Sequence, residues 1–192
     1  MKQGKSLLKN VNIDELDITS FSYEESPKIK EKIPISGWFW PIHDEFAKSG
    51  VYRDFKPLPY ALETLEYLKR KGYELFVITS RDPDLHNIEE DTKISIEKNF
   101  SGFFSEIYFK PKEAKKAEIC KGLAIRVLIE DELDHIIEAT KYSQLLPILV
   151  DRPYNQTSLS LHNIQNGNKE IFQEGGFWRV KDLSNLINFD KI

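Results

Sequence analysis

The sequence predicts an α/β fold in which parallel β-strands alternate with helices. Short apolar runs rich in β-branched residues recur in the second half of the chain, and they end abruptly in polar residues, as at Val77–Asp82 and Val127–Glu132. Stretches with helical spacing of apolar residues separate these runs. A length of 192 residues, with 40% apolar residues, is sufficient for one domain with a real core and a small appendage.

The regular pattern begins near Pro57. Ala61, Leu62, Leu65 and Leu68 form one apolar helix face, and Gly72 ends that helix. The later elements are expected as a strand at 73–79, a helix at 85–100, a strand at 106–109, a helix at 114–123, a strand at 126–129, a helix at 133–140, strands at 148–150 and 178–180, and a helix at 183–187. Residues 157–176 are rich in Asn, Gln and Ser, which predicts a surface loop.

Composition excludes several classes of protein. A net charge of −4 gives no footprint for binding nucleic acid. The single cysteine, Cys120, excludes an internal disulfide and a cysteine-rich zinc site, and it favours a reducing cytoplasm. No apolar run approaches the roughly 18 residues of a membrane span, and Met1–Asn10 lacks the apolar core of a secretory signal.

Polar residues follow the first strong strand pattern. Thr79 and Ser80 come directly after the apolar run, where a hydroxyl and a backbone N–H can donate to a phosphate oxygen, and Arg81 can add a bidentate contact. The alternative is a polar strand end that caps the next helix.

A lysine and an acidic pair complete the candidate site. Lys116 lies at the expected start of a helix and can neutralise a phosphate, with Lys115 as the alternative in a lysine-rich stretch that is otherwise explained by solvation. Glu130 and Asp131 follow a buried strand, where two carboxylates suit Mg²⁺; the alternative is the favourable position of acids at a helix N-terminus.

Together these segments resemble the haloacid dehalogenase superfamily, and within it the 5'(3')-deoxyribonucleotidase group. The likeness is carried by Val51–Arg81, Lys116–Cys120, Val127–Asp131 and Val150–Asn155 and extends from about Asn10 to the end. It implies a three-layer Rossmann-like core at residues 57–192 with a parallel sheet, and a small helical cap segment at residues 1–56.

The resemblance also implies roles for individual residues. Thr79 and Lys116 would be catalytic, phosphate would be bound by Thr79, Ser80, Arg81 and Lys116, and Mg²⁺ would be held by Asp131 and Glu130. The implied reaction is formation and hydrolysis of an aspartyl phosphate. We expect a small phosphorylated substrate such as a nucleotide, with neither a nucleic acid nor a membrane as partner, and the oligomeric state stays open.

The chain departs from this family at the first motif. An acidic DxD should follow an apolar strand ahead of the cap, but the nearest cluster is Asp14, Glu15 and Asp17 with the spacing DxxD, which suits the start of a cap helix. Two hypotheses follow: a cytoplasmic Mg²⁺-dependent phosphomonoesterase of the nucleotidase kind, or a catalytically impaired scaffold that binds a phosphate ligand or a partner. The aromatic cluster at Trp38, Phe39 and Trp40 is expected in the cap core, with stacking on a nucleobase as the alternative.

Overall fold

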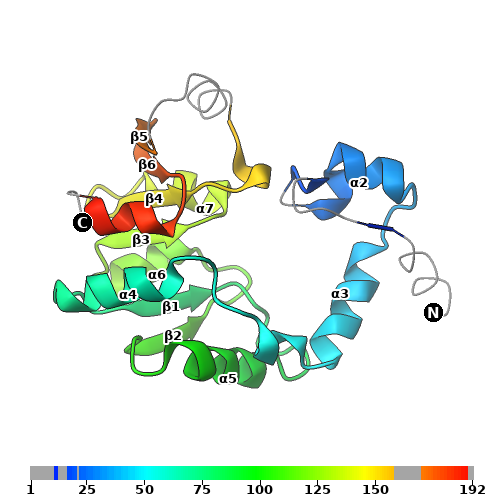
Figure 1. The fold of residues 1–192 in the computed structure, drawn as a ribbon, viewed down its shortest axis with the longest axis horizontal. Coiled ribbons are helices and arrows are strands. Elements are labelled where there is room, and N and C mark those ends of the chain that lie inside the picture. The colour runs from blue at the N-terminus through cyan, green and yellow to red at the C-terminus, as the bar shows by residue number, and fades with distance from the viewer. Residues whose placement is uncertain (1–10, 13–16, 21, 158–169, 190–192) are drawn as a thin grey trace.

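The computed structural model describes residues 11–12, 17–20, 22–157 and 170–189, and it is an α/β structure (Figure 1). Its helices and strands are α2 (Pro27–Lys32), α3 (Phe39–Lys48), α4 (Ala61–Arg70), β1 (Phe76–Thr79), α5 (Ile88–Phe100), β2 (Glu106–Phe109), α6 (Lys116–Gly122), β3 (Val127–Glu130), α7 (Leu133–Ala139), β4 (Leu146–Val150), β5 (Ile171–Glu174) and β6 (Phe177–Val180). Short 3₁₀ helices are η2 (Tyr23–Glu25), η3 (Val51–Asp54), η4 (Pro153–Asn155) and η5 (Leu183–Asn188).

Five of the six strands run parallel, which confirms the predicted fold class. β1 pairs with β2, and β3, β4 and β6 pair in that order, all in parallel. Helices α5, α6 and α7 each connect one parallel strand to the next along the chain. Because parallel strands place their carboxyl ends on one edge, the polar residues that follow β1, β3 and β4 lie on the side of the sheet where ligands bind in open α/β folds.

The sheet is divided into two parts. Among the described residues, β1 and β2 form a two-stranded sheet, and β3, β4, β6 and β5 form a second sheet of four. Figure 1 shows the strands in the order β5, β6, β4, β3, β1 and β2. The sequence analysis predicted one sheet. The division was not predicted because a strand pattern depends on neighbouring residues, whereas strand pairing depends on residues far apart in the chain.

The predicted surface loop at 157–176 is wrong at its carboxyl end. Residues Ile171–Glu174 form β5, which pairs antiparallel with β6 through a two-residue turn at Gly175 and Gly176. Gly175 has a φ of +53°, a conformation that glycine adopts readily. A Gly-Gly pair between two apolar runs is a hairpin signal, and it was available in the sequence. Residues 158–169 lie outside the described part of the chain.

The core lies between the strands and the helices that cover them. Ala117 and Cys120 of α6 pack with Leu128 of β3, and Ile78 of β1 packs against the same cluster. Elsewhere in the core, the Thr64 hydroxyl on α4 donates to the carbonyl of Leu183 in η5 at 2.9 Å. These contacts let α6 hold the two sheets together and fix α4 against the carboxyl-terminal segment.

The described residues before Pro57 contain only helical elements. Ala47 of α3, Tyr52 of η3 and Ile88 of α5 form a small apolar cluster, and Arg53 is paired with the fully buried carboxylate of Asp91. This segment is therefore attached to the α/β part through η3 and α5. The division of the chain at residues 56 and 57 stays a prediction.

The predicted burial of the aromatic cluster is wrong for Trp40. Trp38 and Phe39 are half-buried, but Trp40 is 70% exposed at the start of α3. Phe39 is the centre of the cluster, with ring centroids 5.1 Å from Tyr23 and 5.2 Å from Trp40. Adjacent residues point in different directions around a helix axis. Trp38, Phe39 and Trp40 therefore cannot all face the interior.

Candidate functional site

Lys116 and Glu130 form a buried ion pair at the carboxyl edge of the strands. The Lys116 ammonium, on the first residue of α6, lies 2.7 Å from Oε2 of Glu130, the last residue of β3. Their side chains are 8% and 10% exposed. Burial of two charges is tolerated here because each compensates the other.

Lys115 points elsewhere. Its ammonium binds the carboxylate of Glu138 on α7 at 2.8 Å, and its side chain is about half exposed. That hydrogen bond and the charge of Glu138 raise the pKa of Lys115. Of the two adjacent lysines, Lys116 is therefore the one that faces Glu130 in this structure.

The protonation of Glu130 follows from its neighbours. Burial by itself would raise its pKa, but the nearby His135 and the Lys116 ammonium outweigh burial and lower the pKa to about 2. His135 Nδ1 is 3.7 Å from Glu130 Oε1, which is too long for a hydrogen bond, so we assign the main effect to Lys116 at 2.7 Å. Glu130 is a carboxylate at neutral pH.

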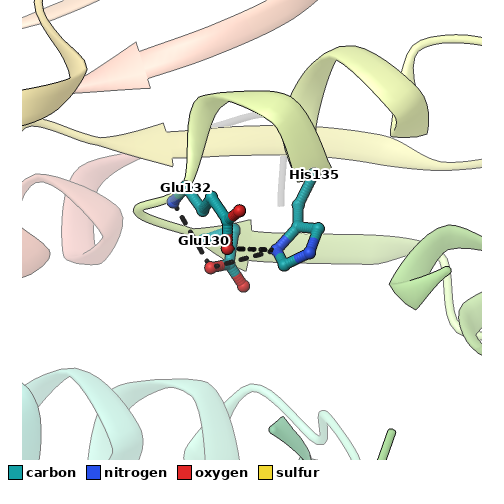
Figure 2. Close-up of side chains that lie close together, drawn as sticks. All are labelled: Glu130, Glu132 and His135. Atoms are coloured by element: carbon teal, nitrogen blue, oxygen red, sulfur yellow. Dashed lines mark hydrogen bonds and ion pairs between the residues drawn. The ribbon is translucent and has the colours of Figure 1, made fainter. Parts of the chain in front are cut away.

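Glu130, Glu132 and His135 form a compact group at the start of α7, as Figure 2 shows. One potential ligand atom from each residue lies within 4.8 Å of the other two. His135 Nδ1 is 3.0 Å from Glu132 Oε2, and the Glu132 N–H donates to Glu130 Oε1 at 3.3 Å. Burial raises the pKa of Glu132. The sequence interpretation missed Glu132 and His135, although an i, i+3 pair at a helix start shares one face.

Asp131 is held in a different direction from Glu130. Its carboxylate accepts a hydrogen bond from the Tyr154 hydroxyl, and its carbonyl accepts one from the Asn155 amide at 2.8 Å. Burial and then the Asp131 contact raise the pKa of Tyr154. Burial also raises the pKa of Tyr23 in η2, and the charge of Asp131 raises it further. Tyr23 and Tyr154 were not predicted as site residues.

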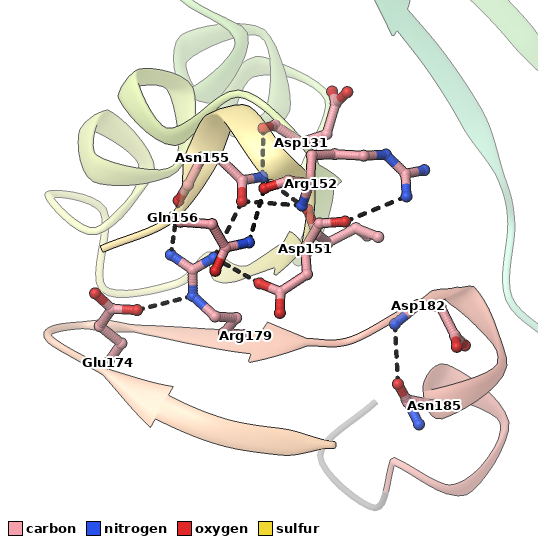
Figure 3. Close-up of polar contacts among 10 residues, drawn as sticks. Asp131, Asp151, Arg152, Asn155, Gln156, Glu174, Arg179, Asp182 and Asn185 are labelled. Atoms are coloured by element: carbon pink, nitrogen blue, oxygen red, sulfur yellow. Dashed lines mark hydrogen bonds and ion pairs between the residues drawn. The ribbon is translucent and has the colours of Figure 1, made fainter. Parts of the chain in front are cut away.

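A buried arginine supports the loop after β4, as Figure 3 shows. Arg179 is fully buried on β6 and binds Asp151 at 2.6 Å and Glu174 at 2.8 Å. Its guanidinium also donates to Asn155 Oδ1 at 3.1 Å, and the Asn155 amide donates to the Val150 carbonyl. This network fixes the loop that carries Tyr154.

The predicted phosphate-binding residues at the end of β1 make contacts with their own neighbours, and none of these contacts is with Lys116 among the described residues. Thr79 ends β1, and its hydroxyl oxygen accepts the Arg81 N–H at 3.2 Å, while Ser80 is exposed. The Arg81 guanidinium donates to Thr92 at 2.9 Å and lies 4.6 Å from the centre of the Tyr52 ring. Arg81 therefore joins α5 to η3 in this structure.

The acidic cluster near the amino terminus does not provide a free carboxylate where the structure describes it. Asp17 is 5% exposed and is paired with Lys28 at 3.3 Å and with Lys32. Asp14 and Glu15 lie outside the described residues. The contacts of Asp17 are those of a structural ion pair.

The fold and this edge define a class: a parallel α/β protein with a buried lysine–carboxylate pair and several acids at the ligand-binding side. No family model matched the sequence. The chain is 29% identical over 152 residues to a protein of Oceanobacillus iheyensis described as "Putative nucleotidase", covering 78% of this chain and 79% of that one. It is 31% identical over 81 residues to a Bacillus cereus protein with the same description, over 42% of each chain.

Among solved structures, the chain matches a "putative phosphoglycolate phosphatase" from Lactobacillus delbrueckii with a TM-score of 0.47 and 19% identity. That match spans 85% of this chain and 62% of the other, so this chain spans less than two thirds of the solved structure's length. None of the helices in the described ranges combines the length and the apolar character that crossing a bilayer requires.

Proposed function

We propose that the chain is the core of a Mg²⁺-dependent phosphomonoesterase of the haloacid dehalogenase type, with a nucleoside monophosphate or a similar small phosphate ester as substrate. The observation that carries this proposal is the buried Lys116–Glu130 pair at the carboxyl edge of the parallel strands, at 2.7 Å. The similarity to two proteins described as nucleotidases supports the same class of hydrolase.

Lys116 can bind a phosphate while it keeps its ion pair with Glu130. An ammonium group has three N–H donors, and only the Glu130 contact is recorded for Lys116 among the described residues. The remaining donors can bind a phosphoryl oxygen, and the Thr79 hydroxyl and the Ser80 N–H can add two more hydrogen bonds from the end of β1. These groups would orient the ester and offset its charge.

The carboxylates at the end of β3 suit Mg²⁺. Asp131 and Glu130 offer hard oxygen donors. Glu132 and His135 lie within 4.8 Å of Glu130, in a group that does not include Asp131. Glu130 and Glu132 are neighbouring carboxylates, and the pKa of Glu132 is raised. A bound cation would relieve the repulsion between their charges. Bound Mg²⁺ would polarise the phosphoryl group. Asp131 and Glu130 would hold it, and Tyr154 would orient the Asp131 carboxylate.

The second candidate function is a scaffold that binds a phosphate ligand without turning it over. It is favoured by one observation: no DxD stands before β1 among the described residues, and the Asp17 carboxylate is buried in ion pairs. The Asp82 and Asp84 pair that follows β1 is exposed, and Asp82 accepts the Asp84 N–H at 3.0 Å. Hydrolysis through an aspartyl phosphate needs a carboxylate nucleophile at this edge. Binding needs only Lys116 and the donors around it.

Calorimetric titration tests the shared part of both candidates. The ligands are inorganic phosphate, a deoxynucleoside monophosphate and the matching nucleoside, each with and without Mg²⁺. We expect phosphate and the monophosphate to bind, more tightly with Mg²⁺, and the nucleoside to bind much more weakly. Equal affinity for nucleoside and monophosphate would show that phosphate is not the anchor, and would contradict both candidates.

The exposed ring of Trp40 gives the same titration a second use. Exposed aromatic faces stack on nucleobases with about 1–3 kcal/mol per base. If Trp40 contacts the base, Trp40→Ala should weaken the monophosphate and leave inorganic phosphate unchanged. An equal loss for both ligands would place the effect in folding of the cap segment.

A further inference from the structure

The group of Glu130, Glu132 and His135 contains a nitrogen ligand that the proposed function does not use. Figure 2 shows the three side chains gathered where β3 ends and α7 begins. Glu130 is the last residue of β3, Glu132 stands directly before α7, and His135 is in the first turn of that helix. Glu132 and His135 are three residues apart, which places them on one helix face.

The nitrogen of His135 that lies nearest the two glutamates has no hydrogen bond. His135 Nδ1 is buried, and none of the described residues gives it a hydrogen-bond partner. Glu132 Oε2 is only 3.0 Å away, so the angles at this contact, and not its length, exclude a hydrogen bond. A buried nitrogen without a partner is costly. A metal ion among the three side chains would provide that partner.

The distances between the potential ligand atoms suit a tetrahedral metal ion. Zinc binds nitrogen and oxygen at about 2.0–2.2 Å, and two ligands of a regular tetrahedron then lie about 3.3–3.6 Å apart. His135 Nδ1 lies 3.0 Å from Glu132 Oε2 and 3.7 Å from Glu130 Oε1, on either side of that range. All three atoms lie within 4.8 Å of one another. The Glu132 side chain is 23% exposed, so it retains freedom to close the remaining distance.

The Glu130 carboxylate is oriented so that one oxygen is directed to each side of it. Lys116 binds Oε2 at 2.7 Å, whereas Oε1 accepts the Glu132 N–H at 3.3 Å and is the oxygen near His135. Contacts of this kind, made by groups behind the ligands, fix the orientation of ligands in metal sites. A metal ion at Oε1 therefore does not need to displace Lys116.

A cavity beside the group has room for an ion and its water. Its volume is about 240 Å³, and its polar lining consists of Lys115, Lys116, Glu132, Asp134, His135 and Glu138. Both lysines are already paired, Lys115 with Glu138 and Lys116 with Glu130. Among the described residues, neither Glu132 nor Asp134 forms an ion pair with a lysine or an arginine. The cavity therefore keeps negative charge that a cation can neutralise.

We propose that Glu130, Glu132 and His135 bind a transition-metal dication of the Zn²⁺ class, with a water molecule from the cavity as the fourth ligand. Imidazole nitrogen suits Zn²⁺, whereas Mg²⁺ requires oxygen ligands in octahedral geometry. Three protein ligands and one water are the ligand set of an open zinc site. The Asp131 carboxylate accepts the Tyr154 hydroxyl and is not in this group, so the site shares only Glu130 with the proposed Mg²⁺ site.

Cobalt binding tests the proposal with a readout other than activity. Co²⁺ occupies the same kind of site as Zn²⁺, and its visible absorption is strong only in four-coordinate geometry. We expect the 192-residue chain to develop these bands with one equivalent of Co²⁺, and Zn²⁺ to remove them where Mg²⁺ does not. A chain that binds Co²⁺ without the bands, or bands that Mg²⁺ removes as readily as Zn²⁺, would overturn the proposal.

Substitution of the ligands is the second test. His135→Phe keeps a ring and removes its nitrogens, and Glu132→Gln alters a partly exposed side chain with little effect on packing. Each should weaken Zn²⁺ binding at least tenfold in a calorimetric titration, because each removes a ligand. Asp134→Asn is the matched control, since Asp134 lines the same cavity outside the group, and it should change the affinity less than threefold. An equal loss in Asp134→Asn would show that the negative charge of the cavity, and not a ligand set, attracts the ion.

Asp131→Asn separates this proposal from the proposed function. That variant should keep its affinity for Zn²⁺ and lose affinity for Mg²⁺, and His135→Phe should show the reverse. Loss of Zn²⁺ binding in Asp131→Asn, with normal Zn²⁺ binding in His135→Phe, would overturn the proposal and assign the ion to the Asp131 site. Because the two metals are titrated separately, the zinc site and the proposed function can fail independently.

Discussion

Lys116 is the residue on which phosphate binding is expected to depend. Charge-assisted hydrogen bonds contribute about 1.5–3 kcal/mol and neutral ones about 1 kcal/mol. Lys116→Ala should therefore weaken phosphate binding by roughly 10- to 150-fold, and Thr79→Val by about fivefold. Calorimetry measures both, and Lys115→Ala is the matched control because Lys115 binds Glu138. A normal affinity in Lys116→Ala with a loss in Lys115→Ala would reassign the role to Lys115.

Asp131 and Glu130 differ in what surrounds them, and this predicts different effects on metal binding. The Asp131 carboxylate, which Asp131→Asn removes, accepts a hydrogen bond from the Tyr154 hydroxyl, whereas Glu130 already shares its charge with Lys116. We expect Asp131→Asn to weaken Mg²⁺ binding far more than Glu130→Gln in a calorimetric titration. Small and equal effects of the two substitutions on Mg²⁺ binding would contradict the metal site. Asp131 and Glu130 would then be acids that are favourable at a helix N-terminus.

The pH dependence of stability isolates Glu130. Its lowered pKa means that its contribution is fully present above the unfolded value of 4.5 and is lost as the pH falls toward about 2. Glu130→Gln should cost about 3–5 kcal/mol at neutral pH because Lys116 is left buried without a counter-charge. The variant should lose less stability than the wild type between pH 5 and 2 in urea unfolding. Parallel curves would show that another group carries this dependence.

Among the structural elements, β6 carries a residue whose importance is entirely structural. Arg179 joins β5, the end of β4 and the loop at Asn155 through four contacts. Arg179→Met leaves the Asp151 and Glu174 carboxylates without their partner, so unfolding free energy should fall by about 3–5 kcal/mol. Lys181→Met, at an exposed pair of 3.9 Å on the same segment, should change it by less than about 0.5 kcal/mol. Equal effects in thermal unfolding would contradict this account.

For the molecule as a whole, we expect the 192-residue chain to bind a phosphorylated ligand without hydrolysing it. Holding a substrate does not by itself lower the barrier, and an aspartyl phosphate needs an attacking carboxylate. The 192-residue chain should therefore release negligible phosphate from deoxynucleoside monophosphates with Mg²⁺, as measured by a phosphate-release assay. An amino-terminally extended form that carries an apolar strand followed by DxD should hydrolyse them.

Two outcomes of that assay would overturn the expectation. Robust turnover by the 192-residue chain that is abolished by Asp14→Asn would make Asp14 the nucleophile. Turnover that survives both Asp14→Asn and Asp17→Asn would mean that the aspartyl-phosphate mechanism does not apply. Asp17→Asn also needs a stability control, because the Asp17 carboxylate is paired with Lys28 and Lys32.

Local patterns were sufficient for the fold class and for most elements. β2 begins and ends where the sequence predicts, β3 is displaced by one residue at both ends, and α7 ends one residue earlier than predicted. The approach of Lys116 to Glu130 also followed from position, because the start of a helix and the end of a parallel strand share one edge of the sheet. The spacing of apolar residues, and the polar or glycine residues that end an element, are properties of neighbouring residues. They can therefore be read directly from the sequence.

The division of the sheet, the burial of Arg179 and the meeting of Glu132 with His135 were not predictable in this way. Arg179 is an ordinary arginine in the sequence, and it becomes a buried connector only because Asp151, Asn155 and Glu174 converge on it from three segments. Pairing of β1 with β2, and its absence between β1 and β3, depends on which strands meet in space. Contacts between residues far apart in the chain are set by packing of the assembled elements, and packing is decided only when every element is in place.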